Sequence, residues 1–427
     1  MAVKGTAALF LHMPSPQSNT WLHRFACLTA AATLVLIGIG GLVTSHEAGM
    51  AVPDWPNSYG YNMFLFPVSK WVGGIFYEHS HRLVATVVGV LVVALTRWLG
   101  GTPSRGPLAA IGLSEFVAGL ALLRWLPEWK AAGYFLNGIG AVVLLAALAW
   151  VRIEPARRPL PQLGWVAFAL VQIQGLLGGL RVVLVRDEIG IFHGVLAQLF
   201  FVTLSAIALL SSGWWEKSRQ TLIGPVPPPG EPQRASGILP WVLVGTTALM
   251  IVQLVLGATM RHEHAGLAIS DFPLAHGKLW PAMDQASIEL YNQQRTEVVG
   301  VHAITAFQVR LQMVHRIVAL LIVVGVAASA WLALKKPGST GVSPARTRLT
   351  MFWAGLVLAQ ALLGAATIWT NKAADVATAH VLVGALSLAT GASLCIIACR
   401  NLTFARRTAD SLEAPFGARP SATGLKS

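Results

Sequence analysis

The side chains best suited to chemistry are a glutamate, a histidine and an arginine that open a long apolar run. Glu78 precedes His81 by three positions, Arg82 follows at once, and the apolar run extends over residues 83–99. Residues three apart share one helix face, so Glu78 and His81 project together. Ionisable groups at the mouth of a membrane-spanning helix are costly to bury and usually functional.

A related pattern returns in the second half of the chain. His315 and Arg316 again open an apolar run, with Gln312 three positions before the histidine. Two single histidines, His193 and His380, open two further runs. The sequence therefore places four histidines at similar points of four apolar segments.

Four histidines in this arrangement predict two bis-histidine haem sites. Neutral imidazole is a good axial ligand of haem iron, and a site inside a helix bundle takes one histidine from each of two facing helices. The two halves of the chain pair His81 with His193 and His315 with His380. Four histidines that only fill packing positions are the simpler alternative, but ionisable groups at membrane depth are rare.

The two arginines and the single glutamate predict different roles for the two sites. Arg82 and Arg316 point about 100° away from the preceding histidine, where each could bind a haem propionate. An arginine that reaches the interface or pairs with a loop is the alternative. Glu78 has no acidic counterpart, since Gln312 takes its place. A reacting haem can need a base or a proton relay, so the first site is the predicted reactive one. A helix N-terminal acid favoured by the helix dipole is the alternative.

Composition places these residues in a polytopic membrane protein. The 427 residues are 55% hydrophobic and 11% charged, which is too apolar for a soluble domain. The formal net charge of +13 does not indicate nucleic-acid binding, because the basic residues lie in short loops between apolar runs. The positive-inside rule puts both termini in the cytoplasm and the four histidines in one layer toward the outer side of the plasma (inner) membrane. The N-terminal segment lacks a clear cleavage site, so the first apolar run is predicted to be retained.

Ten apolar runs are long enough to cross a membrane as helices. They lie at about 25–44, 79–99, 107–126, 131–151, 163–182, 190–212, 239–260, 311–334, 350–370 and 376–398. The third and fourth runs could instead form one re-entrant hairpin, since Glu115 and Arg124 lie near the edges of the third.

Internal repetition predicts an all-α fold of two tandem four-helix bundles related by a pseudo-two-fold repeat. The loop at 48–56 matches the loop at 265–273 at a constant offset, and residues 174–178 match 360–364. The first bundle carries an inserted helical hairpin at about 100–160. The predicted segments are a cytoplasmic N-terminus at 1–24, the N-terminal bundle at 25–212, a cytoplasmic Pro- and Gly-rich linker at 213–238, the C-terminal bundle at 239–400 and a disordered cytoplasmic tail at 401–427.

The remaining cysteines and histidines are predicted to be structural or solvated. The three cysteines lie in apolar runs and form no metal-type cluster: Cys27, Cys395 and Cys399. The loops that contain Asp54 and Asp271 are expected to cap the two sites from outside, with plain turn chemistry as the alternative. Six further histidines are expected to be mostly solvated: His46, His79, His262, His264, His276 and His302.

Together these residues resemble the haem A synthase family, the bacterial and mitochondrial enzymes that convert haem O to haem A. The resemblance covers roughly residues 25–400 apart from the insertion. It rests on these motifs: Gly-Gly-Leu-Val-Thr at 40–44, Pro53-Asp54-Trp55-Pro56, Glu78-x-x-His81-Arg82, His193 with residues 197–201, Val314-His315-Arg316, and His380.

The resemblance implies a two-step oxidation of a haem methyl group to a formyl group, which gives haem A for terminal oxidases. His81 and His193 would ligate the substrate haem O beside an essential Glu78. His315 and His380 would ligate a haem b cofactor that passes electrons. The implied partners are the lipid bilayer, an electron donor and a haem O synthase that delivers the substrate, and a homo-oligomer is left open.

Two features depart from the family pattern. Many bacterial members have a cysteine pair in the first outer loop, where this chain has Val52 and Ser58, so no thiol role carries over. The insertion raises the number of spans from the family's usual eight to about ten.

Two other functions stay open. A quinol-linked electron carrier would hold two equivalent b haems and would tolerate Glu78→Gln. A haem-handling or export protein would bind haem reversibly without oxidising it.

Overall fold

The computed structural model describes residues 19–149, 151–223, 238–294, 303–335 and 344–413. Within these ranges the secondary structure is helical, and the only strand-like features are two isolated bridges. Ten of the helices are long and apolar enough to cross a membrane. The predicted all-α, polytopic membrane protein with ten spans is therefore confirmed.

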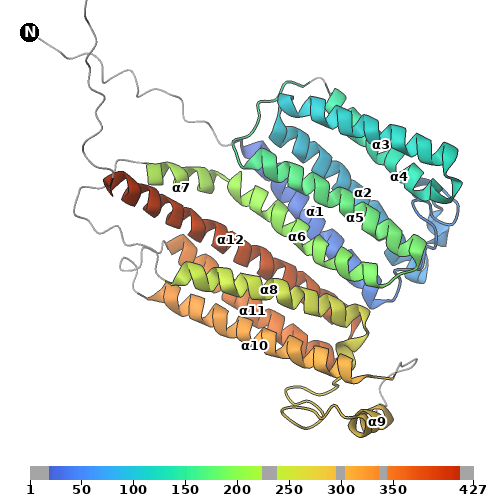
Figure 1. Ribbon diagram of the computed structural model, residues 1–427, viewed down its shortest axis with the longest axis vertical. Coiled ribbons are helices and arrows are strands. Elements are labelled where there is room, and N and C mark those ends of the chain that lie inside the picture. Colours follow the sequence, from blue (N-terminus) through green and yellow to red (C-terminus); the bar gives the residue numbers. More distant parts are fainter. Residues whose placement is uncertain (1–18, 150, 224–237, 295–302, 336–343, 414–427) are drawn as a thin grey trace, which may run out of the picture. The chain divides into compact units, whose positions relative to one another are not determined.

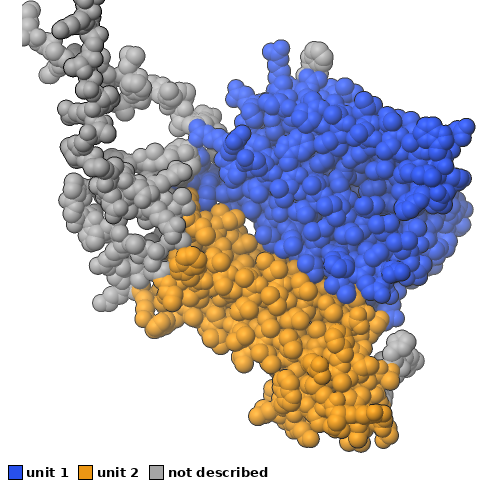
Figure 2. All heavy atoms as spheres, viewed as in Figure 1, with its two compact units in different colours: residues 1–223 blue, residues 224–427 orange. Residues whose placement is uncertain are grey.

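The chain divides into two compact units, Met1–Ile223 (unit 1) and Gly224–Ser427 (unit 2) (Figures 1 and 2). The helices of unit 1 are α1 (Thr20–Ser45), α2 (Gly73–Gly100), α3 (Arg105–Trp125), α4 (Lys130–Leu148), α5 (Leu160–Leu184), α6 (Glu188–Leu210) and α7 (Gly213–Ile223). Those of unit 2 are α8 (Leu239–His262), α9 (Gln285–Gln294), α10 (Ala306–Leu334), α11 (Pro344–Trp369) and α12 (Ala374–Glu413). Short 3₁₀ helices lie at Met63–Leu65, Val68–Lys70, Thr102–Ser104, Pro127–Trp129 and Ala265–Leu267.

Each unit contains a closed ring of four helices. In unit 1, α1 packs on α2, α2 on α5, α5 on α6 and α6 on α1. In unit 2, α8 packs on α10, α10 on α11, α11 on α12 and α12 on α8. The opposite members of each ring are therefore α2 with α6 and α10 with α12. The pseudo-two-fold relation between the two bundles stays a prediction.

Local hydrogen bonds let these apolar segments form helices without stranding polar groups. The Asn19 side chain caps α1 by accepting from the backbone N–H of Leu22, and Thr305 and Gln308 form a capping box on α10. Hydroxyl groups inside the helices donate to the carbonyl four residues earlier, as Thr33 does to Thr29. The spans can therefore carry threonine and serine at membrane depth.

The inserted segment forms a pair of full-length helices. α3 has 21 residues and α4 has 19, which is about 30 Å each at 1.5 Å per residue and enough to span a bilayer. This length favours two spans over a re-entrant hairpin. The pair is held by close backbone approach, with Gly112 facing Gly140 and Gly119 facing Gly133. Small residues of this kind drive helix association in lipid.

We expect Gly140→Ala to weaken the α3–α4 hairpin. A Cβ at position 140 would lie 2.7 Å from the carbonyl oxygen of Gly112, so the helices must separate. Overpacking of this kind costs about 1–3 kcal/mol, which a thermal unfolding series of the detergent-solubilised protein can measure. Gly138→Ala is the matched control, because a Cβ there meets nothing within 4 Å. Equal stability of the two variants would contradict the packing argument.

Three elements differ from the sequence prediction. α7 occupies the first part of the predicted linker at 213–238, and residues 224–237 lie outside the described ranges. α12 runs to Glu413, so part of the predicted disordered tail at 401–427 is helical, and residues 414–427 lie outside the described ranges. α9 lies in the long loop before α10. All three were missed because an apolar-length criterion finds spans, whereas helices can also continue in polar sequence.

Candidate functional site

α2 carries a buried ion pair between Glu78 and Arg82. The Arg82 Nε donates to Glu78 Oε1 at 2.9 Å, and the two side chains are only 7% and 9% exposed. Their spacing of four residues places them one above the other on the helix. The opposite charges compensate each other in a position where either one alone would be costly.

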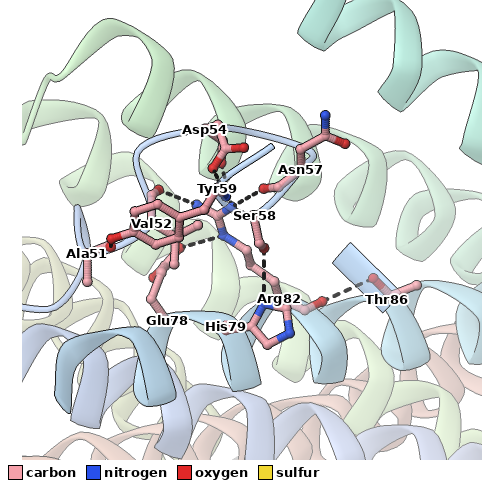
Figure 3. A network of polar contacts seen from close by, with 10 residues as sticks. All are labelled: Ala51, Val52, Asp54, Asn57, Ser58, Tyr59, Glu78, His79, Arg82 and Thr86. Atoms are coloured by element: carbon pink, nitrogen blue, oxygen red, sulfur yellow. Dashed lines mark hydrogen bonds and ion pairs between the residues drawn. The ribbon is translucent and has the colours of Figure 1, made fainter. Parts of the chain in front are cut away.

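The remaining donors of Arg82 hold the loop that follows α1. Its Nη1 donates to the carbonyl oxygens of Asp54 and Asn57 at 2.6 and 2.9 Å, and its Nη2 donates to that of Val52 at 2.8 Å. Figure 3 shows the guanidinium reaching from α2 into the curve of this loop. A guanidinium has five N–H groups, so these contacts use four of them. The predicted contact between Arg82 and a haem propionate stays a prediction.

The loop itself is a compact turn organised by Asp54. The two carboxylate oxygens of Asp54 accept from the backbone N–H groups of Tyr59 and Gly60 at 2.6 and 2.7 Å. Tyr59 and Gly60 have φ of 49° and 76°, the left-handed region that asparagine, aspartate and glycine usually occupy. The Tyr59 hydroxyl donates back to the carbonyl oxygen of Ala51. These bonds fix the carbonyls that Arg82 binds.

Contrary to the prediction that it is solvated, His79 is fully buried. Its exposed fraction is 0%, and its Nδ1 lies 3.0 Å from the Ser58 hydroxyl oxygen. The ring packs against Phe66 and Trp71, with ring centres 4.9 and 4.7 Å away. The sequence-based prediction failed because the position at the helix edge gives no sign that the loop folds back over it.

His81 and His193 come together inside the ring of unit 1, on the opposite helices α2 and α6. Their ring centres are 6.4 Å apart and their planes are inclined at 68°. Each ring faces a glycine on a neighbouring helix, Gly40 for His81 and Gly178 for His193. The Gln174 amide also donates to the backbone carbonyl of His193 at 3.0 Å, which joins α5 to α6.

The 6.4 Å separation fits a bis-histidine haem. Imidazole nitrogens bind transition-metal ions at about 2 Å. Two imidazole rings on opposite sides of one iron therefore have centres roughly 6 Å apart. The glycines leave room beside both rings: a Cβ would lie 3.2 Å from His81 Nε2 at Gly40, which is tight, and 3.4 Å from His193 Cε1 at Gly178, which is ordinary contact. His81 and His193 therefore have the donor type, the opposed placement and the spacing that a haem iron requires.

Unit 2 contains a closely similar loop. The Asp271 carboxylate accepts from the backbone N–H groups of His276 and Gly277 at 2.6 and 2.9 Å. Arg316 donates from Nη1 to the Leu274 carbonyl and from Nη2 to the Asp271 carbonyl, both at 2.8 Å. Its guanidinium also lies over the Phe272 ring. Arg316 and Arg82 thus hold equivalent loops, and the predicted contact of Arg316 with a propionate stays a prediction.

The loops differ at the positions that matter for chemistry. Gln312, the counterpart of Glu78, accepts from the Ile269 N–H at 2.7 Å and donates to the carbonyls of Gly266 and Ile269. An amide in unit 2 therefore binds loop backbone, whereas the carboxylate in unit 1 binds arginine. The difference between Glu78 and Gln312 that is visible in the sequence is therefore also a difference in hydrogen bonding.

His315 and His380 lie on α10 and α12, the opposite helices of the ring of unit 2. Each again faces a glycine, Gly257 and Gly364 respectively. Both have a buried Nδ1 without a hydrogen-bond partner among the described residues. The Gln360 amide nitrogen lies 3.3 Å from the His380 Nε2, so this amide must give way if that nitrogen takes a metal. The donor types and the glycine contacts fit a second bis-histidine haem.

The remaining cysteines and histidines that the sequence analysis named give little indication of a functional site. Cys27, Cys395 and Cys399 form no disulfide, and no cluster of metal-ligating side chains occurs within the described ranges. His276 is part-buried and stacks on Tyr291, and His302 lies outside the described ranges.

Two groups were missed from the sequence. Arg181, near the end of α5, packs its guanidinium against Gly49 at the start of the unit 1 loop and pairs with Asp187 at 3.1 Å. Glu115 on α3 accepts from the Gln172 amide on α5 at 2.6 Å. A basic residue in the last turn of an apolar run was the available signal for Arg181.

The fold and the site together define a multi-pass membrane protein with two helix bundles, each with two histidines on opposite helices. A family model described as cytochrome oxidase assembly protein (COX15-CtaA) matches residues 134–391, and the chain belongs to this family. Among similar curated proteins, Heme A synthase of Hyphomonas neptunium is 27% identical over 380 residues, which is 87% of this chain and 92% of the relative. Heme A synthase 2 of Acidiphilium cryptum is 25% identical over 394 residues, 90% of this chain and 93% of the relative. Heme A synthase of Geobacillus kaustophilus is 24% identical over 369 residues, 84% and 86% of the two chains.

Proposed function

We propose that this protein is a haem A synthase, a membrane oxidoreductase that converts the methyl group of haem O to a formyl group in two successive oxidations. Membership of the cytochrome oxidase assembly family and the names of the relatives support this assignment. The observation that carries it is the buried Glu78–Arg82 ion pair beside His81, whose counterpart in unit 2 is an amide bound to backbone. One of two similar histidine sites therefore has a carboxylate fit for chemistry.

In this proposal unit 1 holds the substrate. His81 and His193 ligate the iron of haem O, and Glu78 stands three residues from His81 on the same face of α2. Arg82 binds Oε1 of Glu78, which leaves Oε2 as the oxygen available to a reacting group. A carboxylate at this place can take up the protons that oxidation releases or stabilise developing positive charge.

Unit 2 is the proposed electron-transfer half. His315 and His380 hold haem b, which supplies one-electron transfer when bound. Gln312 fixes the loop without introducing a charge, and Arg316 is the candidate contact for a haem propionate. In unit 1 the candidate propionate contacts are Arg82, through its remaining N–H, and Arg181.

The proposed setting follows from the charge pattern of the sequence. Both termini lie in the cytoplasm and the histidines lie toward the outer side of the plasma (inner) membrane. A haem O synthase delivers the substrate from the bilayer. Each oxidation consumes an external oxidant such as dioxygen, which is reduced with electrons from the methyl group and from a separate electron donor. The product then serves terminal oxidases.

Haem extraction and chromatography test the proposal. The chain is expressed in a bacterial host that makes haem O but no haem A, and the purified protein is examined for bound haems. Haem A in the extract, with haem b and haem O or A in the protein, supports the proposal. Two b haems without haem A would support the electron carrier, for which the close match of the two loops is the favouring observation. Protein without haem would contradict both.

A glycine beside a proposed ligand provides an independent prediction. A Cβ added at Gly364 would lie 3.1 Å from Cε1 of His380, so Gly364→Ala is expected to push the ring from its place. Overpacking of about 1–3 kcal/mol corresponds to haem binding in unit 2 that is weaker by roughly 5- to 150-fold. The haem b content and the absorption spectrum of the purified protein measure it. Gly355→Ala on the same helix, with nothing within 4 Å of its Cβ, should leave both unchanged.

A further inference from the structure

Ser58 and His79 form a buried polar pair that the proposed chemistry does not use. Both residues are 0% exposed, and the Ser58 hydroxyl lies 3.0 Å from His79 Nδ1. Figure 3 shows the imidazole directed from α2 toward Ser58 in the loop, beside the Arg82 contacts. The loop is thus attached to α2 by two separate polar contacts, one through Arg82 and one through His79.

Unit 2 has an apolar pair at the equivalent position. The counterparts of Ser58 and His79 are Ala275 and Met313, and both belong to one apolar core cluster. The surrounding loop is nevertheless similar, with the same aspartate-centred turn. Arg316 binds two of the three equivalent carbonyls, those of Asp271 and Leu274, and Gln312 binds the third, that of Ile269. In unit 2 an apolar pair at this position, together with the hydrogen bonds of Arg316 and Gln312, closes the loop on its helix.

The histidine in unit 1 is the more demanding choice. Its Nε2 is buried and has no hydrogen-bond partner among the described residues, and such an atom costs stability. Methionine would fill the space between Phe66 and Trp71 without that cost. Retention of a polar pair here points to a need for the hydrogen bond itself.

The pair is placed to control the direction of Glu78. Ser58 adjoins Asn57, whose carbonyl oxygen accepts from the same Nη1 of Arg82 that binds Asp54. Arg82 in turn holds Oε1 of Glu78. A displacement of Ser58 therefore moves the carbonyls that set the guanidinium, and through it the carboxylate.

We propose that Ser58 and His79 are positioning residues for Glu78, which they hold through the loop and Arg82. The inference rests on the proposed function, because Glu78 needs a fixed direction only if it acts on a substrate in unit 1. It assigns to the outer loop of unit 1 a hydrogen-bonded latch that the apolar pair of unit 2 lacks.

The test compares four variants for haem A formation and bound haem. His79→Met and the double variant Ser58→Ala/His79→Met install one or both residues that unit 2 already has. Ser58→Ala removes only the hydroxyl. His79→Asn keeps a polar atom near the position of Nδ1 but fills the space between Phe66 and Trp71 less well than histidine does. Ser114→Ala is the control, since Ser114 is exposed on α3 in the same unit and its hydroxyl donates to the Ile111 carbonyl of its own helix.

We expect haem A formation to fall about tenfold in His79→Met, Ser58→Ala and the double variant, since small misplacements of a reacting group cost up to about 100-fold. His79→Asn should stay within about threefold of the wild type, and haem b content should be unchanged throughout. Full activity of the double variant would overturn the inference. So would an asparagine variant as poor as the methionine one, or parallel losses of haem b and haem A, because these indicate packing alone.

The wild type separates this inference from the proposed function. Absence of haem A from the wild type would contradict the synthase assignment, and with it the need for a positioned Glu78. Haem A in the wild type with equal amounts in all four variants would contradict only the latch.

Discussion

Replacing Glu78 by glutamine is expected to reduce haem A formation by roughly 100-fold or more, the range typical for removal of a general acid–base group. The substitution keeps the size of the side chain, and unit 2 already accommodates Gln312 at the equivalent position. The loop contacts of Arg82 to backbone carbonyls do not involve the carboxylate and should persist. The substitution also leaves the buried Arg82 without its counter-charge and so lowers stability; haem A formation is therefore compared at equal amounts of folded protein that contains haem b. The measurement is the haem A to haem O ratio in extracts, with haem b content as the reading of unit 2.

The matched control is Gln312→Glu in unit 2. It places a carboxylate at the equivalent site without a proposed substrate beside it, so haem A formation should stay within a few-fold of the wild type. Unchanged haem A in Glu78→Gln would remove the carboxylate from the mechanism. A comparable loss from both substitutions would show that the two units are functionally symmetric, which favours the electron-carrier reading.

Arg82→Met should be the most destabilising single substitution in unit 1. It leaves the Glu78 carboxylate buried without its partner and strips three loop carbonyls of their donors. Breaking a buried ion pair by removing one member costs about 3–5 kcal/mol. We expect a lowered thermal midpoint and loss of haem from unit 1 in the purified protein. Thermal unfolding in detergent measures the first effect, and haem quantification by the pyridine haemochrome assay measures the second.

Two comparisons test the physical reason. The double variant Glu78→Gln/Arg82→Met should recover part of the stability, because it no longer buries an unpaired charge. Arg157→Met breaks the exposed pair with Glu216, 3.7 Å long and 56% exposed on the arginine side, and should change stability by less than about 1 kcal/mol. Equal effects of Arg82→Met and Arg157→Met would contradict the importance of burial.

The sequence was informative where one property decides the structure. Length and apolarity suffice for a membrane-spanning helix, so the ten spans and the all-α class were predictable. The histidine at the start of each of four runs was equally visible, and the structure brings His81 and His193 to 6.4 Å. The contacts of Arg82, the burial of His79 and the approach of Arg181 to Gly49 were not predictable. They depend on the path of an irregular loop, which is fixed by backbone hydrogen bonds that residue types alone do not reveal.

The α3–α4 hairpin has a consequence for traffic through the bilayer. α4 packs on α2, Phe135 of α4 lies against Trp55 of the unit 1 loop and against Gly175 of α5, and Glu115 of α3 binds Gln172 of α5. The hairpin therefore covers the side of unit 1 on which α2 and α5 pack together. A hydrophobic molecule that reaches the interior of unit 1 from the lipid must therefore pass between other pairs of neighbouring helices. The additional pair of spans thus reduces the number of lateral entry routes from the bilayer.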